Sequence, residues 1–245
     1  MTKKIHIRFY EELNDFLPGQ KRKKSFELIF NGKTSVKDLI ESQRVPHTEV
    51  DLILVNGESV TFDYLPADGD RISVYPVFET FDISKATRLR PEPLRETLFI
   101  LDVHLGKLAK KLRMLGFDTL YRNDYEDDQI IAIAGKEKRI ILTRDIGILK
   151  NKRVTHGYFL RSTQPEEQLR EVIRHFDLSG SIKPLNRCIN CNGTIIRVDK
   201  EEVSDRLKPK TRKYFDEIFR CTGCGKLYWE GSHYKNMMKK VNELS

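Results

Sequence analysis

The sequence predicts an α/β domain with a largely parallel sheet, preceded by a small α+β domain and followed by a cysteine-rich segment. Short apolar runs alternate with amphipathic helical stretches in the middle of the chain, which is typical of parallel sheets. The first 82 residues show a different order of strand and helix patterns, and all four cysteines come after residue 185. We therefore expect domains at residues 1–82, 97–180 and 181–245, with a proline-containing linker at 83–96.

The charge of the chain is uneven. Its 245 residues include 44 Lys and Arg against 36 Asp and Glu, a formal net charge of +8. Residues 1–82 hold 11 basic and 14 acidic residues, so the rest of the chain carries the positive excess, which favours a nucleic acid as partner. No apolar run approaches the roughly 18 residues of a membrane span, and the N-terminus lacks the apolar region of a secretory signal. We expect a cytoplasmic protein without membrane contact.

The first domain has the pattern of a small mixed sheet with one helix. Strands are expected at residues 3–10, 26–30, 52–55 and 71–77. A helix at residues 36–40, capped by Thr34 or Ser35, separates the second strand from the third. Asn56-Gly57 marks the turn after the third strand. About 80 residues in this order suit a sheet with the helix on one face.

Three runs of this segment resemble ubiquitin-like β-grasp domains, especially the sulphur carriers of thiamine and molybdopterin synthesis. They are residues 36–40, Val55-Asn56-Gly57, and the longer run from Asp68 to Pro76. Those carriers end in Gly-Gly, whose carboxyl end is activated, whereas here the chain continues through residues 78–82. Thiocarboxylate chemistry is therefore excluded. We expect an accessory or docking module that binds a protein partner.

The middle segment alternates strands and helices. Strands are expected at residues 98–101, 118–121, 139–143 and 158–160, and helices at 105–115, 128–138 and 165–176. The first helix places apolar residues every three to four positions, and Lys and Arg fill its remaining surface. Gly116 is expected to end this helix as its C-cap.

Acidic residues follow two of the expected strands. Asp102 comes directly after the first strand, and Asp145 follows residues 140–143. Residues at the carboxyl ends of parallel strands line one crevice, so we expect these acids to converge there with Asp127 or Asp128. Clustered carboxylates suit Mg²⁺ or Mn²⁺, which can activate a water at a phosphodiester. Each acid alone also has a structural interpretation, as a helix cap or a turn residue.

Two runs, from Phe99 to Tyr121 and from Arg139 to Asp145, resemble the Mut-seven C-terminal ribonuclease domain, a family of PIN-like nucleases. The resemblance covers about residues 97–245. It implies a PIN-like fold and a metal-dependent ribonuclease. The acids that match the family pattern are Asp102, Asp127 and Asp145, with Asp128 as the alternative to Asp127.

Three cations are candidate substrate contacts: Lys107, Arg113 and Arg144. For Arg113 the structural alternative is a solvated helix face, and for Arg144 it is a salt bridge. His104, beside Asp102, is interpreted as a packing or substrate-contact residue and not as a general base.

The cysteines form two CxxC pairs, Cys188 with Cys191 and Cys221 with Cys224. Two such pairs supply the four thiolates of a tetrahedral zinc site. The 29 residues between the pairs exceed the usual spacing, but a hairpin with an inserted turn near Pro209 accommodates them. We expect a structural zinc ribbon, since no ligand position stays open for catalysis. Four free thiols or a redox pair are the alternative.

The ribbon segment is also basic and aromatic, which suits contact with the backbone and bases of single-stranded RNA. The alternative is that the aromatic residues form a small core and the lysines only solubilise it. The residues concerned are Arg206, Lys208, Lys210, Arg212, Lys213, Lys226, Lys235, Lys239 and Lys240, with Tyr214, Phe215, Tyr228, Trp229 and Tyr234.

The leading hypothesis is a Mg²⁺- or Mn²⁺-dependent ribonuclease whose zinc ribbon and basic surface hold RNA. Its rival is a non-catalytic RNA- or ribosome-binding adaptor in which the acids serve as caps. A sulphur-transfer protein is the third hypothesis, and the absence of the Gly-Gly end argues against it.

Overall fold

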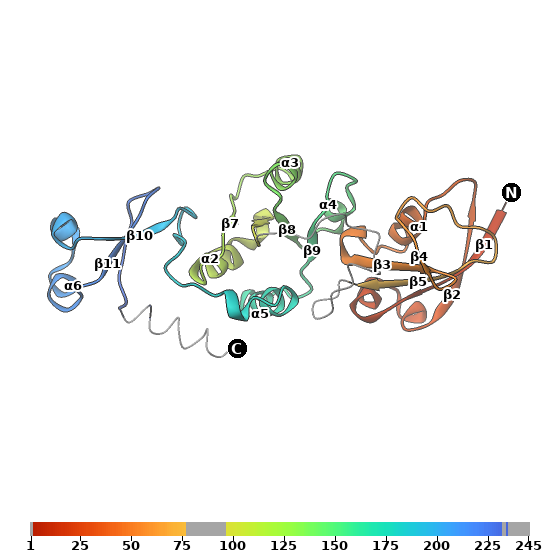
Figure 1. The fold of residues 1–245 in the computed structure, drawn as a ribbon, viewed down its shortest axis with the longest axis horizontal. Helices are drawn as coiled ribbons and strands as arrows, with labels where there is room; N and C mark the ends of the chain where they lie inside the picture. Colours follow the sequence, from red (N-terminus) through yellow and green to blue (C-terminus); the bar gives the residue numbers. More distant parts are fainter. Residues whose placement is uncertain (1, 77–96, 232–233, 235–245) are drawn as a thin grey trace. The chain divides into compact units, whose positions relative to one another are not determined.

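The computed structural model describes residues 2–76, 97–231 and 234 (Figure 1). Contacts divide the chain into two compact units, Met1–Glu96 with Ile131–Phe159, and Thr97–Ile130 with Leu160–Ser245. The expected linker at 83–96 lies outside the described residues, as do Val77 and the lysines at 235, 239 and 240.

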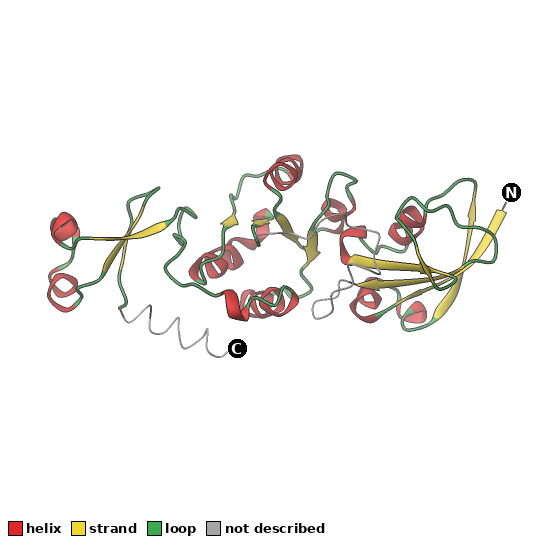
Figure 2. Ribbon diagram, in the orientation of Figure 1, coloured by secondary structure: helices red, strands yellow, loops and turns green. Residues whose placement is uncertain are grey.

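The N-terminal domain is a mixed sheet, as the sequence predicts, but it has five strands where four were expected, because the short β4 escaped the sequence pattern (Figure 2). Strand β1 pairs with β2 in antiparallel fashion and with β5 in parallel fashion, and β3 joins β5 to β4. The order is therefore β2-β1-β5-β3-β4. The strands are β1 (Thr2–Phe9), β2 (Ser25–Asn31), β3 (Val50–Val55), β4 (Glu58–Ser59) and β5 (Arg71–Pro76).

Alternating apolar residues of these strands build the core of the domain. In β1, every second residue from Ile5 to Phe9 is buried, and the sheet packs against helix α1 (Val36–Ser42). Ser35 caps α1 with its hydroxyl and Asp38 returns a carboxylate to the Ser35 backbone N–H, a complete capping box. Three short 3₁₀ helices, η1 (Glu11–Phe16), η2 (Gly19–Lys21) and η3 (His47–Glu49), fill the connections.

The Asn56-Gly57 turn joins β3 to β4 as expected. Both turn residues have positive φ, 51° and 93°, which matches the right-handed twist of a hairpin. The Asn56 amide and the Tyr64 hydroxyl both donate to the buried Asp70 carboxylate, 2.8 and 2.9 Å away. The motif that contains Asp70 thus fixes the loop before β5.

Two parallel strand pairs belong to the C-terminal part of the chain. Strand β6 (Phe99–Leu101) pairs with β7 (Thr119–Leu120), and the chain between them forms η4 (Val103–Leu105) and α2 (Gly106–Met114). Helix α5 (Pro165–His175) packs on α2, where Lys111 and Glu166 form an ion pair of 2.6 Å. The expected β-α-β pattern is confirmed here.

The second parallel pair is β8 (Ile140–Thr143) with β9 (Gly157–Phe159). Helix α3 (Asp127–Glu137) precedes β8, close to the expected bounds. A five-residue helix that the sequence analysis did not predict, α4 (Ile146–Lys150), follows β8.

The cysteine-rich segment forms a three-stranded antiparallel sheet of β10 (Ile195–Val198), β11 (Ile218–Cys221) and β12 (Leu227–Tyr228). The insertion between β10 and β11 holds η6 (Glu201–Arg206) and helix α6 (Pro209–Tyr214), where only a turn was expected. A further 3₁₀ turn, η5 (Ser179–Ser181), comes before the segment.

Candidate active site and metal centre

Asp102 lies at the carboxyl end of a fully buried strand. All three residues of β6 are buried, and Asp102 itself is 7% exposed at the N-cap position of η4. Its side chain makes no capping hydrogen bond. The cap alternative therefore does not explain why a carboxylate occupies this place.

Asp127 and Asp128 are exposed residues of the first turn of α3. The Gln129 side chain accepts the Glu126 backbone N–H at 3.0 Å, and the Glu126 carbonyl accepts the N–H of Ile130. Glu126 and Gln129 thus form the N-terminus of α3, half of a capping box. The field of the helix N-terminus favours the negative charge of both aspartates.

Asp145 is the N-cap of α4. Its Oδ1 accepts the Gly147 backbone N–H at 2.6 Å, and its own N–H donates to the Thr143 hydroxyl at 2.8 Å. The structural alternative, in which Asp145 caps a helix, is therefore confirmed, and the capping bond uses Oδ1 of this exposed carboxylate. Arg144 precedes it, also exposed, directly after β8.

Asp102, Asp127 and Asp128 belong to one compact unit, and Arg144 and Asp145 belong to the other. The first three are not part of a tight ligand group within the residues that the structure describes.

A cavity of about 610 Å³ opens beside the residue that follows Asp102. Lys107 and Lys110 line it from α2, and Tyr121 also lines it, with its hydroxyl donating to the Val103 carbonyl at 2.9 Å. Lys107 is exposed, as a substrate contact requires. The rest of the wall includes His104, Gly106, Thr163, Gln164 and Gln168.

Arg113 is buried, 5% exposed, which neither interpretation from the sequence anticipated. Its guanidinium donates to the Thr119 carbonyl at 2.9 Å and to the carbonyls of Ile189 and Asn190 at 3.3 and 3.0 Å. Burial lowers the pKa of Arg113, and the Cys188 and Cys191 sulfurs and Asp118 oppose that shift. Arginine remains charged regardless, so the buried cation joins α2 to the first cysteine pair.

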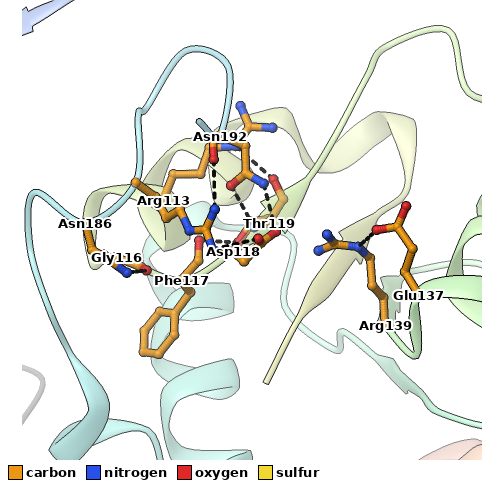
Figure 3. A network of polar contacts seen from close by, with 10 residues as sticks. Arg113, Gly116, Phe117, Asp118, Thr119, Glu137, Arg139, Asn186 and Asn192 are labelled. Atoms are coloured by element: carbon orange, nitrogen blue, oxygen red, sulfur yellow. Dashed lines mark hydrogen bonds and ion pairs between the residues drawn. The ribbon is translucent and has the colours of Figure 1, made fainter. Parts of the chain in front are cut away.

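A polar network around Arg113 attaches the cysteine-rich segment to β7 (Figure 3). Asn192 follows the first cysteine pair in a left-handed conformation, φ +67°. Its side chain accepts the Thr119 N–H at 2.9 Å and donates to Asp118 at 2.8 Å. Arg187 pairs with the same carboxylate at 2.9 Å. Sequence reasoning missed these contacts because the partners are some 70 residues apart.

The four cysteine sulfurs gather at one point, with all four lying within 4.8 Å of one another. Cys188 and Cys224 are 3.6 Å apart, and Cys191 and Cys221 are 3.4 Å apart. A tetrahedral zinc with Zn–S bonds of about 2.3 Å requires sulfurs about 3.8 Å apart. The donor set therefore fits one zinc ion.

The surroundings of Cys188 and Cys191 shift their pKa values in opposite directions. Burial opposes ionisation of Cys188, but hydrogen bonds from the Tyr228 hydroxyl and nearby backbone N–H groups outweigh it and lower its pKa to about 6. Burial is the largest cause that raises the pKa of Cys191 to about 12, and hydrogen bonds with the other three cysteines raise it further. A metal ion would supply positive charge at these sulfurs.

Comparisons with known families agree with this architecture. The family model described as the Mut7-C RNAse domain matches residues 97–241, and the one described as Mut7-C ubiquitin matches residues 2–82. No curated protein and no solved structure matches the chain. Every helix within the described ranges is too short or too polar to cross a bilayer.

Proposed function

Because the chain belongs to the Mut7-C RNAse domain family, we propose that it is a metal-dependent ribonuclease with a PIN-like fold. The observation that carries the proposal is Asp102, a buried carboxylate at the end of β6 whose side chain makes no capping hydrogen bond to η4. In parallel sheets such a position belongs to the functional crevice. Asp145 follows the end of β8 after one intervening residue, and the parallel pairing of β6 with β7 and of β8 with β9 supports the proposed fold.

Asp102, Asp127 and Asp145 are the proposed ligands of Mg²⁺ or Mn²⁺, with Asp128 as the alternative to Asp127. Carboxylate oxygens are the donors that hard divalent cations prefer, and Asp145 keeps one oxygen outside its capping bond. A bound cation would help to activate water and would neutralise charge at the phosphodiester. Hydrolysis then joins the water oxygen to phosphorus and breaks the bond to one ribose oxygen.

Lys107 and Arg144 are the proposed phosphate contacts. Both are exposed and each lies within a few residues of a proposed metal ligand. The cavity at Lys107 offers space for a nucleotide beside Val103, the residue that follows Asp102. We assign Arg113 a different role, since its guanidinium already serves three backbone carbonyls.

The four cysteines are proposed to hold one structural zinc ion in a zinc ribbon, with domain boundaries at 97–180 and 181–245. Thiolate ligands persist in a reducing compartment, so this proposal is consistent with a cytoplasmic protein.

The ribbon adds a basic face, where the Lys213 ammonium lies 5.4 Å from the centre of the exposed Tyr214 ring. Phe215, Tyr228 and Trp229 instead pack on the ribbon cores, as the alternative interpretation held. Tyr214 is therefore the aromatic residue best placed to stack on an RNA base.

A non-catalytic RNA- or ribosome-binding adaptor is the second candidate, and one observation favours it: Asp145 serves as a helix cap.

Cleavage and binding assays distinguish the two candidate functions. The ribonuclease cleaves defined RNAs with Mn²⁺ and stops in EDTA, and Asp102→Asn and Asp145→Asn lower the rate at least about 100-fold without abolishing RNA binding. The adaptor binds RNA in EDTA and cleaves nothing with Mn²⁺. Unchanged cleavage by both variants would refute the assigned site.

A further inference from the structure

The ubiquitin-like domain makes buried polar contacts with the segment that follows β8, within one compact unit. The Glu49 carboxylate of η3 accepts the backbone N–H of Phe159, the last residue of β9. Glu49 is only 3% exposed. A buried carboxylate needs such partners, because its desolvation is otherwise costly.

His47, also in η3, bridges two acceptors. Its Nδ1 lies 2.7 Å from the Glu41 carboxylate and its Nε2 lies 2.8 Å from the Val154 carbonyl. A carboxylate and a carbonyl can only accept, so an imidazolium with two N–H groups satisfies both at once. His47 as a whole is 7% exposed. Lys150, at the end of α4, donates to the Glu41 carbonyl at 2.8 Å.

Apolar packing accompanies these bonds. The Phe16 and Phe159 rings meet edge to face, with centres 5.4 Å apart. Ile146 and Phe159 both pack against the core of the ubiquitin-like domain. The first residue of α4, the last residue of α4 and the last residue of β9 therefore all contact this domain.

We propose that the ubiquitin-like domain is an internal clamp for the strand end that carries Arg144 and Asp145. The face made by Phe16, His47 and Glu49 is an interaction surface, and its partner is the α4–β9 segment of the same chain. Asp145 caps α4, so a shift of α4 moves that carboxylate. Glu49 and His47 are thus positioning residues, and this consequence rests on the proposed ribonuclease function.

The clamp is tested in the full-length protein by hydrogen exchange and by single-turnover cleavage of one RNA with Mn²⁺. Glu49→Ala removes the acceptor for Phe159, Glu49→Gln restores one through its amide oxygen, and the exposed Glu58→Ala is the control. We expect Glu49→Ala to speed exchange at residues 157–159 about tenfold and to lower the cleavage rate about tenfold, with RNA affinity little changed. Glu49→Gln should recover most of the wild-type protection from exchange and most of the cleavage rate, and Glu58→Ala should match the wild type in both.

Exchange across β1 shows whether a variant has kept its fold. If Glu49→Ala unfolds the domain, Lys150→Met replaces it, because it removes only the ammonium contact to Glu41. Unchanged exchange in β9 overturns the clamp. Faster exchange with an unchanged cleavage rate overturns its link to Asp145. A wild type that cleaves no RNA refutes the proposed ribonuclease, while the exchange result still decides the clamp.

Discussion

At the scale of single residues, Gly116 and Arg113 show how far local sequence can be interpreted. Gly116 was predicted as the C-cap of its helix; the C-cap is Leu115, and Gly116 follows it at a φ of +95°, with the N–H groups of Gly116 and Phe117 bonded to α2 carbonyls. A Cβ added at Gly116 would lie 2.0 Å from the backbone carbonyl oxygen of Lys183. This contact could not be predicted from local sequence, because Lys183 is 67 positions away.

Gly116→Ala is therefore expected to destabilise the protein by at least about 2 kcal/mol, because positive φ and a backbone clash act together. Gly135→Ala is the matched control: it lies inside α3 with open space around it and should be neutral or stabilising by up to about 1 kcal/mol. Urea unfolding of both variants measures the difference. Equal midpoints would contradict the contact with Lys183.

Arg113→Ala is expected to cost roughly 2–4 kcal/mol, since it leaves buried carbonyls without a donor. Arg197→Ala, an exposed arginine paired with Glu217, should cost less than about 1 kcal/mol. The free energy of unfolding from urea titration compares the two. If both variants lose less than about 1 kcal/mol, the buried role of Arg113 is contradicted, and the solvated position considered from the sequence is favoured.

At the scale of elements, periodicity predicted the long helices and the buried strands, whereas short elements escaped it. Helices α2 and α5, of 9 and 11 residues, have apolar faces that repeat over more than two turns, so their pattern is visible in the sequence. Helix α4 spans five residues and depends on Asp145 as its cap and on packing against another domain. Its existence could not be inferred from a five-residue pattern, and neither could the clamp at Glu49.

The cysteine site is predicted to hold one zinc ion per chain, measured by elemental analysis of purified protein. Cys221→Ser should lose most of that zinc, because three remaining thiolates bind far more weakly than four. It should also speed amide exchange at Thr119, whose N–H donates to Asn192 beside the first cysteine pair. Zinc content unchanged in Cys221→Ser would contradict the four-cysteine site.

At the scale of the whole molecule, the formal charge differs between the N-terminal domain and the rest of the chain. Residues 1–82 are mildly acidic, and the excess of Lys and Arg lies in the rest of the chain. The exposed Lys210 and Arg212 of α6 belong to that excess. The basic balance was evident from composition, but which cations stay exposed and which become buried, as Arg113 does, depends on tertiary contacts.

RNA binding is predicted to weaken steeply with salt, as it does when phosphate contacts release counterions. Charge reversal in the variant with Lys210→Glu and Arg212→Glu should lower the affinity and flatten the dependence of log Kd on log salt. Lys33→Glu, in the ubiquitin-like domain, should leave both unchanged. Fluorescence anisotropy with a labelled single-stranded RNA in EDTA measures the slopes. Identical slopes for all three proteins would exclude the ribbon as an RNA surface.

The most direct test of the proposed ribonuclease is the single-turnover cleavage rate of one defined RNA with Mn²⁺, compared between wild type, Asp102→Asn and Asp177→Asn. Asp177 is an exposed residue at positive φ, a conformation that asparagine tolerates well, so this control repeats the same chemical change away from the site. We predict that Asp177→Asn cleaves at the wild-type rate and that Asp102→Asn is at least about 100-fold slower. Equal rates for Asp102→Asn and the wild type would contradict the proposed site.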